Sequence, residues 1–297
     1  MTYTKDITVI IPHRDTPQYL PNLLASIPKS AKIEIIIVDN STVPLQSGQI
    51  ETDREFTLLH SDMARKGGGA RNEGIVHAHG KWLVFADADD FFSADAFDAF
   101  YRHIDTNAEL VFFTMKAVFR ETGQPSVRTD RYVRLVDDYL SGATNEMFLR
   151  LYYSSPCAKM VSHAMVDRHG LRYDEGIAAD DKYFCMQCGY HAQKVEADLQ
   201  VVYIATVTHG SQTQTLNDTV MYTRLEVNLR CNQFLRSHGL AAYQFSILNF
   251  FLLTLKARPM LLPRLMCLLV RYRQNPLVGA SRWIKTAKTY KMSKERA

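Results

Sequence analysis

Residues 82–90 read Trp-Leu-Val-Phe-Ala-Asp-Ala-Asp-Asp, an apolar run that ends in a cluster of carboxylates. The continuous apolar run predicts a buried strand. Asp87, Asp89 and Asp90 follow this strand with almost no spacer. Carboxylates this close repel one another unless a cation or hydrogen-bond donors neutralise them. The stretch therefore predicts a buried strand whose end carries a charged site.

Strand-like and helix-like segments alternate on both sides of this stretch, through residues 1–115. The predicted strands are 7–11, 33–38, 57–60, 82–86 and 110–113, and the predicted helices are 19–27, 69–78 and 94–104. This alternation predicts an α/β fold with a mostly parallel sheet. Ligands bind such sheets beyond the carboxyl ends of the strands, and Asp39 and Asp87 both lie at that edge.

The aspartate cluster has two interpretations. Hard carboxylate oxygens suit Mg²⁺ or Mn²⁺, which bind through one or two carboxylates together with substrate phosphates. Alternatively, Asp89 or Asp90 caps a helix near residues 91–94, since aspartate is favoured at that position.

A glycine-rich stretch, residues 67–74, precedes the cluster and reads Gly-Gly-Gly-Ala-Arg-Asn-Glu-Gly. Glycines let a backbone approach a ligand closely, and Arg71 offers a fork of donors to a phosphate. No Gly-Lys-Ser/Thr follows, which excludes a P-loop, and no GxGxxG follows the first strand, which disfavours a dinucleotide fold. The alternative is a glycine-rich turn before an ordinary helix.

Four stretches in this order resemble family 2 glycosyltransferases of the GT-A fold. They are ITVIIPHRDTPQYLPNLLASI (7–27), IEIIIVDNST (33–42), GGGARNEGIVHAHGKWLVFADADD (67–90) and GIAADDKYF (176–184). The resemblance is strong over residues 5–115 and weaker over 150–212. It implies a GT-A nucleotide-diphospho-sugar transferase fold, a mostly parallel sheet flanked by helices, with a C-terminal helical extension.

The resemblance assigns several residues to the donor. It places Pro12 where the nucleotide pocket begins, with the neighbouring His13 as a further candidate. Asp39 is implied to accept a hydrogen bond from the base. Arg71 and Asn72 match the family's Ala-Arg-Asn signature near the donor.

The resemblance also assigns the acidic residues. Asp87 and Asp89 match the family's DxD pair, with Asp87 at the ribose or metal and Asp89 at the metal. Asp180 and Asp181 match a Glu-Asp pair before an aromatic helix, in which Asp181 is the catalytic base. This chain has Asp180 where the family usually has glutamate, so this side chain, which we expect to bind substrate, is shorter.

Two further assignments depart from the family's pattern. Lys159 parallels a lysine in a Trp-Gly-Lys stretch, although Cys157 and Ala158 stand in place of the tryptophan and glycine. The family's later arginine-rich loop has no arginine here, and His209 is the candidate there for a further metal ligand. Lys159 is thus expected to bind substrate and His209 to bind metal.

The implied activity is that of an inverting, hexosyltransferase-type glycosyltransferase that uses Mn²⁺ or Mg²⁺. Its donor is a nucleotide-sugar, most commonly a UDP-sugar in this family. Its acceptor is a glycan or a lipid-linked molecule in bacterial surface polysaccharide synthesis, as in capsules and lipopolysaccharide. The alternatives are a sugar nucleotidyltransferase and a non-catalytic nucleotide-sugar-binding scaffold.

The expected domain organisation separates an acidic body from a basic tail. Residues 1–215 form the transferase domain, with a nucleotide-sugar-binding half (1–115) and an acceptor-binding half (116–215), and residues 216–297 form a basic helical region. From residue 256 to the end, eleven Lys/Arg and one Glu give a net charge of +10, which leaves −6 for residues 1–255 of the total of +4.

The basic tail has three interpretations. The default is a solvated helical face. Nucleic-acid binding is disfavoured, because no recognition module accompanies the charge. The third is peripheral docking on an anionic membrane, because Leu277, Val278, Trp283 and Ile284 accompany the basic residues.

Composition and hydropathy set the expected location. Five scattered cysteines suit a reducing compartment, and the first residues do not resemble a signal peptide. The apolar runs 245–255 and 260–270 are too short to span a bilayer. Cys185 and Cys188 lack the partners of a zinc site, so helix packing is the better interpretation. We expect a cytoplasmic protein, with peripheral contact at the inner face of the plasma membrane left open.

Overall fold

The computed structural model describes residues 3–208, 217–257 and 259–280. His209 lies outside the described residues, as do Trp283 and Ile284. The chain forms two compact units, Met1–Thr215 and Leu216–Ala297, which are described separately below.

The first unit is built on one sheet, with nine strands in the described residues. The strands are β1 (Lys5–His13), β2 (Ile33–Asp39), β3 (Thr57–His60), β4 (Gly80–Phe85), β5 (Phe91–Phe92), β6 (Leu110–Phe119), β7 (Pro125–Ser126), β8 (Lys159–Ser162) and β9 (Val195–Val207). Their order is β3-β2-β1-β4-β8-β6-β9-β5, with β7 paired to β6. β3, β2, β1 and β4 are parallel, as are β6 and β9, whereas β8, β5 and β7 pair antiparallel with their neighbours.

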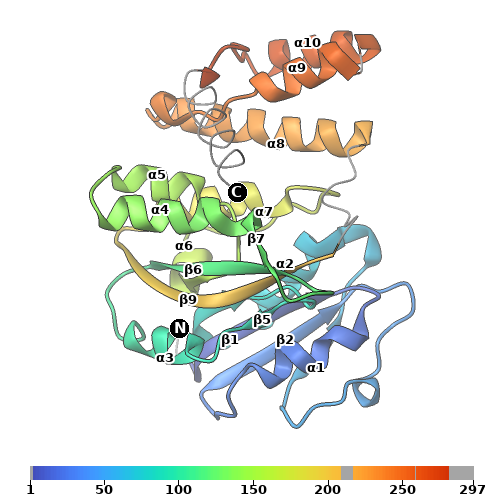
Figure 1. Ribbon diagram of the computed structural model, residues 1–297, viewed down its shortest axis with the longest axis vertical. Helices are drawn as coiled ribbons and strands as arrows, with labels where there is room; N and C mark the ends of the chain where they lie inside the picture. Colours follow the sequence, from blue (N-terminus) through green and yellow to red (C-terminus); the bar gives the residue numbers. More distant parts are fainter. Residues whose placement is uncertain (1–2, 209–216, 258, 281–297) are drawn as a thin grey trace. The chain divides into compact units, whose positions relative to one another are not determined.

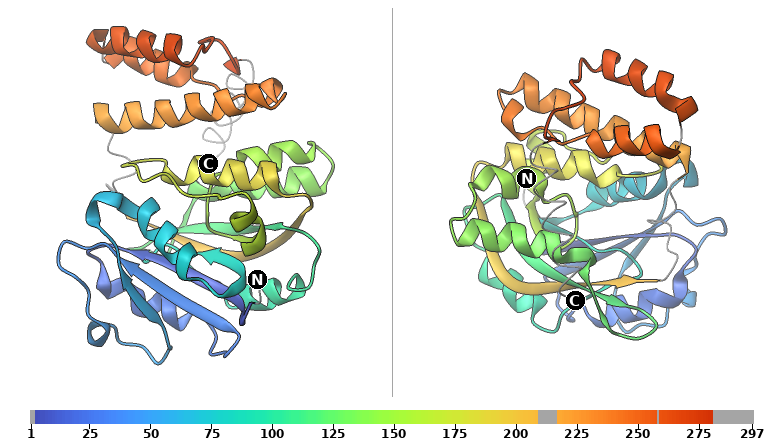
Figure 2. Two further views of the ribbon diagram at one scale, coloured as in Figure 1. Left: turned by 180° about the vertical axis from the view of Figure 1, so that it is seen from behind. Right: turned by 45° about the horizontal axis from the view of Figure 1, so that its top comes forward.

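Helices cover this sheet. They are α1 (Leu20–Ala25), α2 (Lys66–His77), α3 (Ala96–Arg102), α4 (Asp130–Leu140), α5 (Glu146–Tyr152), α6 (His163–Arg168) and α7 (Asp180–His191). Figure 1 shows α4, α5 and α7 over one side of the sheet and α1 on the other, and Figure 2 shows the same arrangement from behind. This is the mostly parallel, helix-flanked sheet that the sequence predicted.

The core explains why the central strands are continuous apolar runs. Ile10, Ile37 and Val84 are fully buried in adjacent parallel strands that are covered on both faces. Burying one such side chain stabilises the fold by about 1.5–3 kcal/mol. Phe92 and Tyr203 pack edge to face with ring centroids 5.6 Å apart, which joins β5 to β9. Both rings are buried, so the chain that follows the aspartate cluster is anchored in the core.

The predicted strands agree with the observed ones over their central residues, and the prediction of residues 57–60 coincides with β3. The alternative of a helix near residues 91–94 is wrong. Phe91 and Phe92 instead pair with Ile204 and Tyr203 of β9. Because the chain is extended there, neither Asp89 nor Asp90 caps a helix.

The second unit is helical in its described residues. It contains α8 (Asp218–Ser237), η6 (Ala241–Tyr243), α9 (Leu248–Ala257), η7 (Pro259–Leu261) and α10 (Leu262–Arg271). Its core joins these helices through Leu225, Leu229, Ile247, Leu265 and Leu269. Within the described ranges, no helix combines the length and the apolar character that crossing a bilayer requires.

Candidate active site

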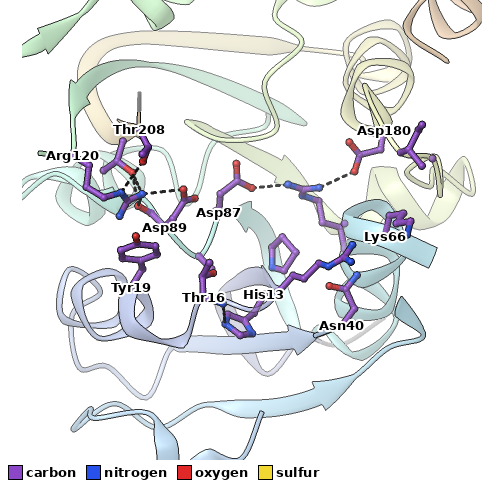
Figure 3. Close-up of a pocket in the computed structure, with 18 of the residues that line it drawn as sticks. His13, Thr16, Tyr19, Asn40, Lys66, Asp87, Asp89, Arg120, Asp180 and Thr208 are labelled. Atoms are coloured by element: carbon purple, nitrogen blue, oxygen red, sulfur yellow. Dashed lines mark hydrogen bonds and ion pairs between the residues drawn. The ribbon is translucent and has the colours of Figure 1, made fainter. Parts of the chain in front are cut away.

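A cleft of about 770 Å³ opens in the first unit where β1, β2 and β4 end (Figure 3). Polar and charged side chains dominate its walls, as expected for a site that receives a charged ligand. They come from the strand ends, α2, the segment before α7 and the chain that follows β6 and β9. The lining residues used below are Pro12, His13, Tyr19, Asn40, Lys66, Gly67, Arg71, Asp87, Asp89, Arg120, Arg128, Asp180 and Thr206.

Arg71 joins two walls of the cleft. Its guanidinium donates to Asp87 Oδ1 at 2.6 Å and to Asp180 Oδ2 at 3.1 Å, as the dashed lines in Figure 3 show. Burial alone would lower the pKa of Arg71, but the charges of Asp87 and Asp180 raise it well above its usual value. The guanidinium therefore stays charged and orients both carboxylates. Two of its donors bond protein carboxylates, so Arg71 positions Asp87 and Asp180 in this structure, and its contact with a phosphate stays a prediction.

The glycine run at the start of α2 lets another segment pack onto the helix. A Cβ on Gly68 would lie 1.8 Å from the backbone oxygen of Asp174, a separation that real atoms do not tolerate. Gly67 lines the cleft. The sequence predicted that these glycines serve close approach to a ligand. At Gly68 the approaching group is the protein's own backbone, which carries the chain toward Asp180.

Asp89 faces a second arginine across the cleft. Arg120, which follows β6, donates to Asp89 Oδ2 and to the Asp89 carbonyl oxygen, each at 3.0 Å. The same guanidinium bonds Thr206 and lies 3.8 Å from the ring centroid of Tyr19. Burial, and next the charge of Asp87, raises the pKa of Asp89, while Arg120 opposes that rise. The repulsion between Asp87 and Asp89 is therefore only partly offset by Arg120, although basic residues outnumber acidic ones among the lining residues.

Asp90 turns away from the cleft into the floor. Its carboxylate accepts from the Tyr203 hydroxyl at 2.9 Å and from the Thr206 amide at 2.7 Å. The Tyr203 hydroxyl in turn accepts from the Asp87 amide. Burial, and next the charge of Asp87, raises the pKa of Asp90 well above its usual value. Asp90 therefore fixes the backbone that presents Asp87 and Asp89.

The metal predicted from the sequence can be tested against this geometry. In the described part of the chain, no three His, Cys, Asp or Glu side chains gather in a way that would hold a metal ion. Asp87 and Asp89 nevertheless line one cleft, and each uses only one oxygen in its ion pair with arginine. Two hard carboxylates plus substrate phosphates are a donor set that Mg²⁺ or Mn²⁺ accepts. The residues present therefore fit such an ion, and His209 lies outside the described residues.

The end of β2 supports the cleft from beneath. Asp39 is 2% exposed and accepts from His13 Nδ1 at 2.8 Å, from the Ser41 hydroxyl at 2.5 Å and from the Leu45 amide at 2.9 Å. Burial opposes ionisation, but these hydrogen bonds lower the pKa of Asp39. Pro12, His13 and Asn40 line the cleft, and Asp39 does not. His13 thus lies between the cleft and Asp39, and the predicted hydrogen bond from Asp39 to the base stays a prediction.

Two other predicted binding residues lie away from the cleft. Asn72 clamps the backbone of Tyr173, donating from Nδ2 to its carbonyl at 3.0 Å and accepting from its amide at 2.8 Å. Lys159 is 1% exposed, and its Nζ donates to the Tyr153 carbonyl at 2.6 Å. Both side chains are committed to the protein interior. The predicted substrate contacts of Asn72 and Lys159 stay predictions, and in this structure both side chains bond the protein backbone.

The acidic pair begins α7. Asp180 lines the cleft and bonds Arg71, whereas Asp181 lies beside it in the first helical turn and is not among the lining residues. Burial, and next the charge of Asp180, raises the pKa of Asp181 from 3.8 to about 6. A carboxylate with such a pKa takes up a proton near neutral pH more readily than an ordinary aspartate.

Several cleft residues were missed by the sequence interpretation. Arg120, Arg128 and Lys66 bring cations to the acidic wall, and Tyr19 supplies an aromatic face. Tyr19 lies in the stretch 7–27 that carries the family resemblance, which assigned it no role, and the other three belong to no recognisable motif. The one available signal for Arg120, Arg128 and Lys66 was their position in the segments between predicted elements, where cleft-forming loops occur.

Comparisons with known proteins agree with this architecture. Putative glycosyltransferase EpsH of Bacillus subtilis is 24% identical over 202 residues, which cover 65% of this chain and 58% of EpsH. The structure of Staphylococcus aureus TarS 1–349 in complex with UDP-GlcNAc matches with a TM-score of 0.62 at 19% identity, over 90% of this chain and 80% of that chain. The curated relatives are longer, since this chain spans 58% of EpsH and 36% of TarS.

A second solved structure extends the fold comparison. Mannosyltransferase PcManGT from Pyrobaculum calidifontis, in complex with GDP-Man and Mn²⁺, matches with a TM-score of 0.50 at 18% identity, over 98% of this chain and 81% of that chain. At these identities the likeness establishes the GT-A fold. The sequence model of Glycosyl transferase family 2 matches residues 8–170, which is more than half of the chain. The chain therefore belongs to glycosyl transferase family 2.

Proposed function

We propose that the chain transfers a sugar from a nucleotide-sugar donor to a glycan or lipid-linked acceptor, with inversion, in bacterial surface polysaccharide synthesis. The observation that carries this proposal is the Arg71 bridge, which holds the carboxylates of Asp87 and Asp180 in one cleft. It brings the end of β4 and the start of α7, nearly a hundred residues apart, to a single reaction space.

The cleft suits an anionic donor. Lys66, Arg120 and Arg128 line it and offer positive charge to a diphosphate, and Pro12 and His13 line it as well. The proposed donor is a UDP-sugar. Staphylococcal TarS has been crystallised with UDP-GlcNAc and PcManGT with GDP-Man, so both kinds of nucleotide occur in similar structures. Residues 1–115 are proposed to bind the donor and residues 116–215 the acceptor.

Asp87 and Asp89 are the residues that would hold a divalent cation. When bound, Mn²⁺ or Mg²⁺ supplies positive charge to the departing nucleoside diphosphate. The chain's own cations, Arg120 and Arg128, stabilise the same developing charge from the cleft wall. Arg71 keeps Asp87 in place throughout, since its guanidinium is buried and doubly paired.

Asp181 is proposed as the base. An acceptor hydroxyl is a poor nucleophile until a carboxylate accepts its proton, and the raised pKa of Asp181 suits that task. The oxygen of the acceptor forms the new bond to the anomeric carbon as the diphosphate oxygen leaves. A single displacement of this kind inverts the anomeric configuration, by the logic that governs inverting glycosidases. Asp180, paired with Arg71, is proposed to bind substrate beside it.

Product analysis tests the function. The purified chain is incubated with a panel of UDP-, GDP- and dTDP-sugars, with Mn²⁺, Mg²⁺ or chelator, and the released phosphates are identified. Transfer releases a nucleoside diphosphate, and its slow release by hydrolysis is expected without acceptor. Pyrophosphate formation from a sugar phosphate and a nucleoside triphosphate would show a nucleotidyltransferase instead. Donor binding by thermal shift with no turnover on any acceptor would show a scaffold.

A further inference from the structure

The second unit carries an exposed apolar strip that its own core does not use. In α10, Leu265 and Leu269 are buried in the core of the unit, whereas Met266 and Val270 are 48% and 74% exposed. Residues four apart lie one above the other on a helix, so Met266 and Val270 share a face that points away from that core. Soluble surfaces rarely gather such side chains without a partner.

Further large apolar side chains are exposed outside α10. Six large apolar side chains between residues 252 and 277 are exposed: Leu252, Leu255, Met260, Met266, Val270 and Leu277. Met260 is the most exposed of them, at 90%. They lie on α9, on the short η7 that joins α9 to α10, on α10 itself and on the segment that follows (Figure 1). We call this set the apolar strip.

Basic side chains accompany the strip. Lys256, Arg264, Arg271 and Arg273 are all exposed, and the chain has no Asp or Glu between Val227 and Lys294. The nearest acidic contact in the described residues is Glu226, whose carboxylate lies 3.7 Å from Arg271. This combination of exposed apolar side chains and basic residues with little acidic compensation is typical of an interfacial helix, whose apolar face enters the headgroup region while its cations meet anionic lipids.

An arginine-lined cavity at the end of α10 gives this surface a place for a headgroup. The cavity has a volume of about 500 Å³ and is lined by Arg236, Arg271 and Arg273, with Gln233, Ser237 and Tyr272. Arg236 is held from behind by Gln274 and by the Tyr272 carbonyl. Arg273 has a φ of +48°, a conformation that favours glycine after a helix end, yet the position carries a cation. A phosphate is the group that such a set of guanidinium donors recognises.

We infer that α9, η7 and α10 form a docking surface for an anionic membrane, with the apolar strip entering the headgroup layer and the arginine-lined cavity receiving a lipid phosphate. This goes beyond the proposed transfer reaction and does not depend on it. It also places the contact on α9, η7 and α10, whereas the sequence pointed to Leu277, Val278, Trp283 and Ile284 among the basic residues of the tail. The occupant is an anionic lipid surface and not a nucleic acid, because binding a nucleic acid does not require exposed Met and Val side chains.

Vesicle co-sedimentation of the full chain tests the inference. Binding is compared on phosphatidylcholine vesicles with and without phosphatidylglycerol, at low and high salt. The wild-type chain is expected to bind only the anionic vesicles and to be released by salt. Arg271→Gln and Arg273→Gln are each expected to weaken binding about fivefold. Met266→Gln with Val270→Gln is expected to weaken it at least as much, since both apolar anchors are removed.

Matched controls keep the result interpretable. Val43→Gln and Arg134→Gln change exposed residues of the first unit and should leave vesicle binding unchanged. Circular dichroism establishes that each variant is folded. The inference is overturned if the wild type ignores anionic vesicles, or if the strip and cavity variants bind them as tightly as wild type. Loss of binding in the arginine variants alone would also overturn it, because a purely electrostatic contact needs no apolar strip. A concentration-dependent dimer that the strip variants dissociate would show a second copy of the chain as the occupant instead.

Discussion

Arg120 and Asp89 form an ion pair of 3.0 Å across the cleft, with the guanidinium stacked on Tyr19. The carboxylate that the family motif assigns to a metal is thus already held by a cation of the chain. Since Asp87 lies close enough to raise the pKa of Asp89, Arg120 neutralises a repulsion that a bound divalent cation would also neutralise. A metal bound at Asp89 would therefore compete with Arg120 for the same charge.

The Arg120→Gln variant should bind Mn²⁺ more tightly than wild type in the absence of donor. A partly exposed ion pair contributes up to about 1 kcal/mol. Freeing Asp89 from Arg120 should therefore increase the affinity for Mn²⁺ roughly fivefold. Calorimetric titration with Mn²⁺ measures it. Arg102→Gln, which breaks a comparable pair with Asp198 outside the cleft, is the control and should change nothing. Unchanged or weaker Mn²⁺ binding by Arg120→Gln would contradict a metal at Asp89.

The Asp181→Asn variant should bind donor normally but lose transfer by about 10²–10⁴-fold, the usual contribution of a general base. Activity of the wild type should rise with pH through about 6, because the base must be ionised. Donor affinity by thermal shift and turnover by nucleotide release are the two measurements. Parallel loss of donor affinity and turnover in Asp181→Asn would contradict the assignment of Asp181 as the base. A larger loss of turnover in Asp180→Asn, with donor affinity retained, would contradict it as well.

The Asp181→Asn substitution should also stabilise the fold at neutral pH. The pKa of Asp181 is raised in the folded chain from 3.8 to about 6, so ionising this carboxylate costs about 3 kcal/mol of stability. The cost is complete above pH 6, shrinks as the pH falls and vanishes below 3.8, where folded and unfolded chains are both protonated. Asp181→Asn should therefore raise Tm at pH 7.5 and match wild type near pH 4. Asp105→Asn, with a side chain 96% exposed, should show no such pH-dependent difference.

The Gly68→Ala variant should separate α2 from the segment that follows Tyr173. The added Cβ meets the Asp174 carbonyl at 1.8 Å, and forced overpacking of this kind costs about 1–3 kcal/mol. Donor affinity should fall as well, since Asp180 moves with that segment. Gly48→Ala is the matched control, because nothing lies within 4 Å of the added methyl. Equal unfolding midpoints for the two variants in urea would refute the close packing.

The Lys159→Met variant should leave donor binding and turnover within about twofold of wild type. Its ammonium bonds the Tyr153 carbonyl and lies over the rings of Tyr153 and Phe112, inside the core. A stability loss of about 1–3 kcal/mol is expected from the carbonyl left without its partner. Steady-state kinetics measure both donor binding and turnover. A hundredfold loss of turnover would instead support the substrate-binding role that the sequence predicted for Lys159.

Sequence reasoning located the fold and the edge of the sheet where the cleft lies, because both follow from periodicity. The apolar runs that became β1, β2 and β4 could be read directly, and Asp87 had to follow the end of its strand. Side-chain direction could not be predicted in the same way. Arg71 and Asn72 are adjacent, yet about 100° of helical rotation sends one to the cleft and the other to Tyr173.

The residues that sequence reasoning missed lie where tertiary contacts decide. Arg120 follows a strand in the middle of the chain, and only the pairing of β6 with β9 brings it to Asp89. His13 was a secondary candidate because nothing in the sequence showed that Asp39 would be buried beneath it.

The span of one guanidinium sets the separation of Asp87 and Asp180, and Arg71 Nε, buried without a partner, shows how little room is left around that group. Arg71 consequently connects the two acidic walls of the cleft and fixes the distance between them. A designer who lengthens Asp180 to glutamate, to mimic other family members, must also shorten Arg71 or shift α7. A change on either acidic wall of this cleft is therefore transmitted to the other through Arg71.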